Sequence, residues 1–100
     1  MTTATTAIDI GTLITSHPGI HRGTPILAGT GVTVRRIAID RNSGLTPEEI
    51  ASEIPHLTLA QVHAALTYYY ANQEAMDAEI AAYFEECDRL EAEYMAGNKS

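Results

Sequence analysis

The apolar and polar residues between positions 44 and 66 predict two short helices joined by a tight turn. Thr46 is a natural cap for the first helix, and Glu49 stands three residues later, where its side chain can reach back to that cap. Thr58 and Gln61 repeat the arrangement at the second helix. Pro55 disfavours helical backbone at the residue before it and so separates the two. The stretch therefore predicts a helix-turn-helix unit.

Beyond the turn, apolar residues recur every three or four positions along the remainder of the chain. No proline or glycine interrupts this periodicity until Gly97. It predicts one helix from Leu59 to about Met95, with a possible bend at Asn72-Gln73. Such a helix would extend more than about 50 Å, which is longer than a small domain can cover. Its second half is therefore expected to pack against something other than this domain.

Upstream of the turn, residues 20–34 contain two apolar pieces among three glycines and predict two short strands that turn at Ala28–Gly31. A hairpin of this size is weak alone, so it is expected to pack on helices or to pair with a second copy. The candidate dimer-strand residues are Ile26, Leu27, Val32 and Val34. Residues 8–16 are compatible with a short strand or a helical turn, and Val34–Ser43 predicts a first helix that Gly44 ends.

The predicted fold is therefore mainly α with a short β-hairpin: a helix-turn-helix domain followed by a long C-terminal helix. The domain is assigned to residues 8–72 and an acidic amphipathic extension to residues 73–100. Residues 1–7 are rich in threonine and alanine and are expected to be disordered. A domain this small is usually marginal alone, which makes a homodimer an expectation.

The formal net charge of −7 is unevenly distributed, with −1 on residues 1–73 and −6 on residues 74–100. Neither part is the strongly basic surface of a dedicated nucleic-acid binder. The single cysteine, Cys87, excludes an internal disulfide and fits a reducing compartment. The N-terminal sequence does not resemble a signal peptide, and no apolar stretch has membrane-spanning length, so a cytoplasmic protein without membrane contact is expected.

Three arginines of the first predicted helix, Arg35, Arg36 and Arg41, lie largely off its apolar face. Two interpretations are open: a solvated helix surface, or contacts with the phosphates of DNA. If the helix from Leu59 reads bases, only Gln61 among its outward residues has a suitable side chain. Any DNA binding is therefore expected to be weak and salt-sensitive.

The C-terminal extension combines an apolar seam with acidic flanks, which include Asp77, Glu79 and Glu86. A parallel coiled coil of two copies would bring Glu86 and Glu91 together, which is unfavourable. A different partner with basic flanks suits it better, and the alternatives are a tail folded back on Arg35 and Arg36 or a solvated helix. The apolar anchors expected at such a partner are Met76, Ile80, Tyr83, Phe84, Leu90 and Tyr94.

Chemistry typical of an enzyme is missing from the sequence. The histidines His17, His21, His56 and His63 have no carboxylate or cysteine at a recognised metal-ligand spacing. The glycines match no phosphate-binding loop, and no serine or cysteine lies in a nucleophile motif. No enzymatic activity, metal, cofactor or small-molecule substrate is expected.

With these residues considered, the sequence resembles the small prokaryotic family called domain of unknown function 433. The resemblance covers about residues 13–72. Two departures from the family pattern are Gly31, where arginine is usual, and Ile54, where an aromatic is frequent. The matching segments are Pro18-Gly19, Gly23 to Thr30, Val32 to Val34, Gly44 to Ile50, Pro55 to Thr58 and Ala65 to Tyr68.

The resemblance implies a winged-helix-like or helix-turn-helix domain that is commonly dimeric. It also implies an antitoxin role, because members with an acidic helical extension are often encoded beside a PIN-like nuclease toxin. The leading hypothesis is an antitoxin whose C-terminal helix binds and inhibits such a nuclease, with operator DNA as a second ligand. The competing hypothesis is a dimeric interaction module that does not bind DNA and whose C-terminal helix self-associates.

Overall fold

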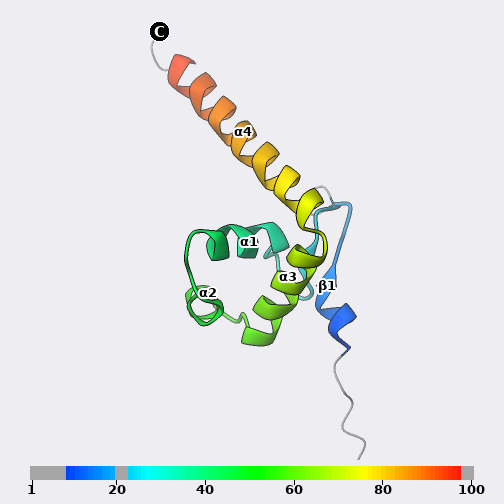
Figure 1. Ribbon diagram of the computed structural model, residues 1–100. Coiled ribbons are helices and arrows are strands. Elements are labelled where there is room, and N and C mark those ends of the chain that lie inside the picture. The colour runs from blue at the N-terminus through cyan, green and yellow to red at the C-terminus, as the bar shows by residue number, and fades with distance from the viewer. Residues whose placement is uncertain (1–8, 20–22, 98–100) are drawn as a thin grey trace, which may run out of the picture.

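A computed structural model describes residues 9–19 and 23–97, and the segment 1–7 that was expected to be disordered lies outside these ranges. The described chain is mainly helical, with one antiparallel pair of strands and a long C-terminal helix, as predicted (Figure 1). In chain order the elements are η1 (a 3₁₀ helix, Ile10–Leu13), β1 (Ile14–Thr15), β2 (Ile26–Leu27), α1 (Val34–Asn42), α2 (Pro47–Glu53), α3 (Leu59–Ala71) and α4 (Gln73–Gly97).

The strand pair differs from the predicted hairpin. β2 pairs antiparallel with β1, and the expected second strand, residues 32–34, forms an isolated antiparallel bridge with β2, from Thr33 to Ile26, supported by hydrogen bonds from Leu27 N–H to the Val32 carbonyl and from Val34 N–H to the Pro25 carbonyl. The chain leaves the sheet there because Thr33 caps α1: its hydroxyl oxygen accepts the N–H of Arg36, and Val34 begins the helix. For residues 8–16 the sequence was compatible with either a short strand or a helical turn. The described part of this segment forms both, first η1 and then β1.

The two capped helix starts are present as predicted. At α2 the N–H of Glu49 donates to the hydroxyl of Thr46, and the N–H of Thr46 donates to the Glu49 carboxylate at 2.9 Å. This backbone hydrogen bond lowers the pKa of Glu49 from its ordinary value, because it stabilises the charged form. Thr58 and Gln61 make the same reciprocal pair at α3. His56 closes the turn between the helices in a left-handed conformation, with φ of 65°.

Replacing Thr46 with alanine should lower the free energy of unfolding by about 1 kcal/mol, because the N–H of Glu49 loses its acceptor. Thr46→Ser keeps a hydroxyl at the cap and should retain most of the stability. Urea unfolding of the wild type and both variants measures the difference. Equal losses in the two variants would contradict a capping role for this hydroxyl.

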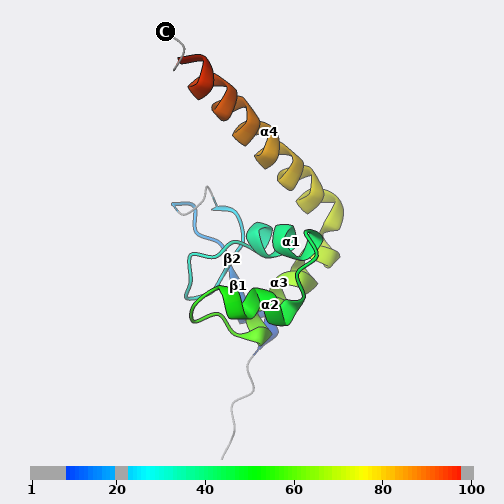
Figure 2. The same cartoon turned by 90° about the vertical axis from the view of Figure 1, so that its left-hand side faces the viewer.

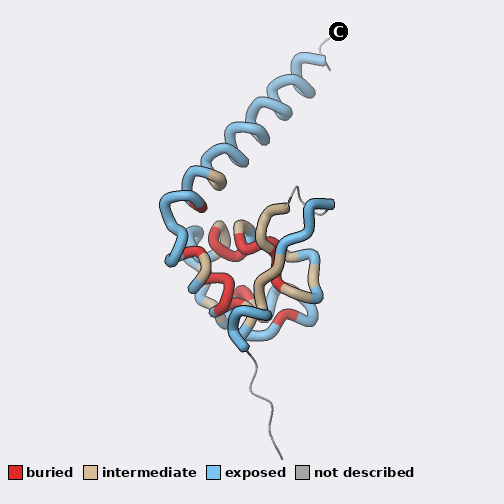
Figure 3. The backbone as a smooth tube through the Cα atoms, turned by 90° about the vertical axis from the view of Figure 1, so that its right-hand side faces the viewer, coloured by how far each residue is buried: buried red, intermediate tan, exposed pale blue. Residues whose placement is uncertain are grey.

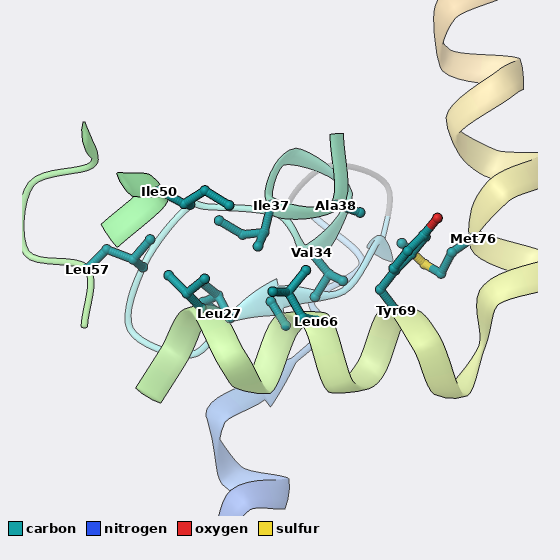
Figure 4. Close-up of a cluster of buried hydrophobic side chains, with 11 residues drawn as sticks. Leu27, Val34, Ile37, Ala38, Ile50, Leu57, Leu66, Tyr69 and Met76 are labelled. Atoms are coloured by element: carbon teal, nitrogen blue, oxygen red, sulfur yellow. The ribbon is translucent and has the colours of Figure 1, made fainter. Parts of the chain in front are cut away.

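The core lies where α1, α2 and α3 meet over β2 (Figure 4). Each helix contributes from its apolar stripe, with Ile37 from α1, Ile50 from α2 and Val62 from α3 fully buried, and Leu27 closing the core from β2. Burial of side chains this size is the main favourable term in folding. The core does not end with α3, because Met76 of α4 also belongs to it.

The long helix predicted from position 59 onward is two helices, broken at the place where a bend was expected. Asn72 has non-helical backbone (φ −126°, ψ 34°), and its N–H and side-chain amide donate to carbonyls at the end of α3. Figures 1 and 2 show that α4 then leaves in a new direction and projects far beyond the other helices. The molecule is consequently elongated, with extents of 74 × 29 × 26 Å. Across the described residues, no helix is both long and apolar enough to cross a membrane.

Candidate functional site

The first turns of α4 belong to the folded domain and not to a free tail. Met76 is only 3% exposed and packs in the core beside Tyr69 (Figure 4). Ile80 is partly buried and packs against the same cluster. Met76 was expected to contact a partner, but its side chain already contacts its own domain. The structural boundary therefore falls several residues after position 72.

A partly buried hydrogen-bond network holds the base of α4 to α1 and α3. The hydroxyl of Tyr69 donates to the Asp77 carboxylate at 2.5 Å, and the side-chain amide of Asn42 donates to the same hydroxyl at 3.2 Å. The Tyr69 ring is 2% exposed, so this hydroxyl depends on protein partners. Asp77, expected at a partner interface, instead orients α4 on its own domain.

Arg35 is the second link between α4 and the domain. Its guanidinium lies 3.5 Å from the Glu79 carboxylate and 4.3 Å from the centre of the Tyr83 ring. Thr24 adds a hydrogen bond from its hydroxyl to Glu79. The tail therefore folds back on Arg35, one of the alternatives left open by the sequence, and the contact involves two residues that were assigned to a partner.

The remaining candidate DNA contacts are also engaged within the chain. Arg36 pairs with Asp40 at 3.3 Å one turn along α1, and Arg41 donates to the carbonyl of Leu45 at 3.4 Å. The side-chain oxygen of Gln61 accepts the N–H of Thr58, since it completes the cap of α3. Two arginines of α1 form ion pairs, and Arg36 is the more exposed of them: 56% of its side chain is exposed, against 20% for Arg35.

The outward face of α3 is partly covered by the N-terminal segment. Ala64 is 3% exposed, and η1 lies beside α3. An apolar groove of about 480 Å³ runs between the two, lined by Ile10 and Leu13 on one side and by Ala60 and Ala64 on the other. A recognition helix needs this face free to enter the major groove, so the arrangement does not favour base reading by α3.

The distal half of α4 carries an exposed apolar stripe, here called the arm stripe. Figure 3 shows this half of the helix as continuously exposed, in contrast to its base. Leu90 is 50% exposed and Tyr94 is 69% exposed, and acidic residues flank them. Arg89, the basic residue between positions 84 and 97, is already paired with Glu86 at 3.0 Å and Glu93 at 2.9 Å. The arm stripe consists of Phe84, Cys87, Leu90, Tyr94 and Met95.

The candidate dimer strands lie inside the protomer. Ile26, Leu27 and Val34 are each 2% exposed or less, and Val32 packs partly against the same core. β2 also has neighbours on both sides, β1 on one and Thr33 on the other. It therefore has no free edge for a strand of a second copy, so the strand pairing expected from the sequence is not available at β2.

No group of three or more potential metal ligands occurs in the described part of the chain. His17, His56 and His63 are all exposed, and His21 lies outside the described residues. The exposed Cys87 belongs to the arm stripe.

Comparison with known proteins finds similarity over the residues that form the folded domain. Residues 14–69 match the model of a family described as a protein of unknown function, DUF433. The chain belongs to the DUF433 family. A crystal structure of a DUF433 member from Anabaena variabilis superimposes with a TM-score of 0.65 at 31% sequence identity, over 70% of this chain and 69% of the other. Among curated proteins, none matches the chain.

Reasoning from sequence missed one feature of this DUF433 protein and left another open between alternatives. The cover of α3 by η1 has no local signal, because Ile10 and Leu13 show no periodicity that assigns them to one helix face. The Arg35–Glu79 pair joins residues 44 positions apart. Opposite charges on two amphipathic helices allow such a pair without specifying it.

Proposed function

We propose that this DUF433 protein is an antitoxin-type protein that binds and inhibits a PIN-like nuclease through the distal half of α4. The observation that carries the proposal is the arm stripe: large apolar side chains exposed along one face of a helix that extends beyond its own domain. Exposed apolar patches on a helix are typical of helix-in-groove recognition. The arm stripe alone, without Met76, Asp77 and Glu79, is the proposed contact surface.

The charge of the arm specifies the kind of groove. Between positions 84 and 97 there are five acidic residues and one basic residue, and that residue, Arg89, is internally paired. A partner groove with an apolar floor and basic rims matches both properties. A nuclease that binds RNA needs a basic surface, and an acidic helix lying across it would block the substrate.

Operator DNA has weaker support as a second ligand. Gln61 is used in a cap, α3 is partly covered, and Arg35 is held by α4. We therefore propose that the domain contributes only sequence-independent phosphate contacts from α1, where Arg36 is more exposed than Arg35.

The test is copurification with the product of the reading frame adjacent to this gene. If that product is a small nuclease, co-expression should yield a stable complex in which its cleavage of RNA is suppressed. Truncation after position 83 keeps the base of α4 and removes the whole arm stripe, and it should abolish the complex. An adjacent product that is captured equally by the truncated chain, or not captured at all, would refute the proposed function.

A further inference from the structure

A hollow of about 250 Å³ lies where the turn before α1, α1 itself and α4 come together. Its polar lining is contributed by Thr33, Arg35 and Arg36, and Tyr83 of α4 forms one wall. Two adjacent arginines thus line one concavity, together with the apolar residues Val32 and Ile39. Guanidinium groups bind phosphate oxygens through paired N–H donors, so the arginine side of the lining suits a phosphate.

Within the folded chain, each of the two arginines already faces a carboxylate: Arg36 pairs with Asp40 at 3.3 Å on the same helix, and Arg35 pairs with Glu79 of α4. The Glu79 carboxylate lies 3.5 Å from Arg35, whose side chain is 20% exposed and stacks on Tyr83 at 4.3 Å. Glu79 is itself 33% exposed, so the pair is accessible to water and to ions. An ion pair this exposed is individually weak. A phosphate, with more negative charge and more acceptor oxygens, can compete for Arg35.

We propose that the hollow binds a phosphate group and that Glu79 competes with that group for Arg35. The carboxylate of α4 then acts as an internal substitute for phosphate: while it holds Arg35, an external anion can contact only Arg36, where it shares the guanidinium with Asp40. Because coupling between two sites is reciprocal, phosphate binding also weakens the hold of Arg35 on the base of α4. The inference deepens the phosphate-contact part of the proposed function and rests on it.

Glu79→Gln is the informative substitution. Glutamine has the same shape and keeps an oxygen that can accept the hydrogen bond of Thr24, but it removes the charge that holds Arg35. Glu93→Gln is the matched control, because it also removes one negative charge from α4 and breaks an ion pair, the one with Arg89. The control separates competition at the hollow from a general reduction of the negative charge of the protein.

Binding is measured at low salt with the full chain, using fluorescence anisotropy for a short DNA duplex and calorimetry for inorganic pyrophosphate. Glu79→Gln should tighten binding of at least one ligand by about 5-fold or more, the lower end of typical coupling between sites. Glu93→Gln should change it less than about 2-fold, and adding Arg35→Ala to Glu79→Gln should remove the gain. For DNA, the logarithm of the affinity should fall more steeply with the logarithm of the salt concentration, by an amount that corresponds to about one more released counterion. A gain with DNA alone identifies a nucleic-acid backbone as the source of the phosphate, and a gain with pyrophosphate identifies a free phosphoanion.

Equal affinities of Glu79→Gln and Glu93→Gln would overturn the proposal, and so would the absence of binding by both the wild type and Glu79→Gln. Circular dichroism of each variant checks that α4 stays helical. Capture of the nuclease-like partner depends on the arm stripe and not on Glu79, so it is measured separately. If capture succeeds and Glu79→Gln gains nothing, this inference alone fails.

Discussion

Replacing Leu90 with aspartate is expected to weaken capture of the nuclease-like partner by at least about 100-fold. Leu90 lies near the middle of the arm stripe and is 50% exposed in the free chain. In the proposed complex its side chain is buried in an apolar groove, where an aspartate would leave a charge without a partner. The neighbouring cation, Arg89, already holds two carboxylates and offers no compensation.

The matched control for this change is Ala92→Asp. Position 92 is exposed, receives the same new charge and lies two residues along α4, which places it about 200° around the helix from position 90. Titration of the partner by calorimetry should show near-wild-type affinity for Ala92→Asp. Equal weakening by both substitutions would assign the effect to added charge, and no weakening by Leu90→Asp would exclude the arm stripe as the interface.

The same variant separates the antitoxin proposal from self-association of the C-terminal helix. If the arm stripe pairs with a second copy, Leu90→Asp should lower the mass of the isolated chain in light scattering. If the stripe serves a different partner, that mass should stay the same while capture of the partner is lost. Since Leu90 is outside the core, the free energy of unfolding should change by less than about 0.5 kcal/mol.

Replacing Met76 with alanine is expected to reduce the free energy of unfolding by about 2–5 kcal/mol. Met76 is 3% exposed and packs beside Tyr69, so the shorter side chain leaves a cavity between α3 and α4. The change also weakens the attachment of α4, which depends on this contact and on the Tyr69–Asp77 hydrogen bond. For a domain of ordinary stability this is a large fraction of the total.

Met95→Ala is the natural control, because it makes the same substitution on the same helix at a side chain that is 54% exposed. Chemical denaturation should show a change of less than about 0.5 kcal/mol for this variant. Similar losses for the two methionines would mean that the base of α4 is not part of the folded core. The pair of variants thus tests the domain boundary independently of any partner.

Much of the helical part of this fold follows from local rules. The starts of α2 and α3 depend on Thr46 and Thr58, each with a reciprocal partner three residues later. The first helix ends before Gly44, whose φ of 107° suits glycine. These elements were predictable because each boundary requires only a neighbour in sequence. The strand pairing was not, because Ile14 and Leu27 are brought together by the helices beneath them.

The candidate site likewise has features that follow from the sequence and features that depend on tertiary contacts. The sequence by itself determined that α4 is amphipathic, acidic and longer than its domain needs, since these are properties of spacing and composition. The apolar seam continues without change from Met76 to Tyr94, however, so periodicity does not tell which part is already covered. That was decided only by the tertiary structure. The break at Asn72 directs α4 past α1, where Met76 is buried and Glu79 meets Arg35, and beyond these contacts no further part of the described domain is near enough to cover Leu90 and Tyr94.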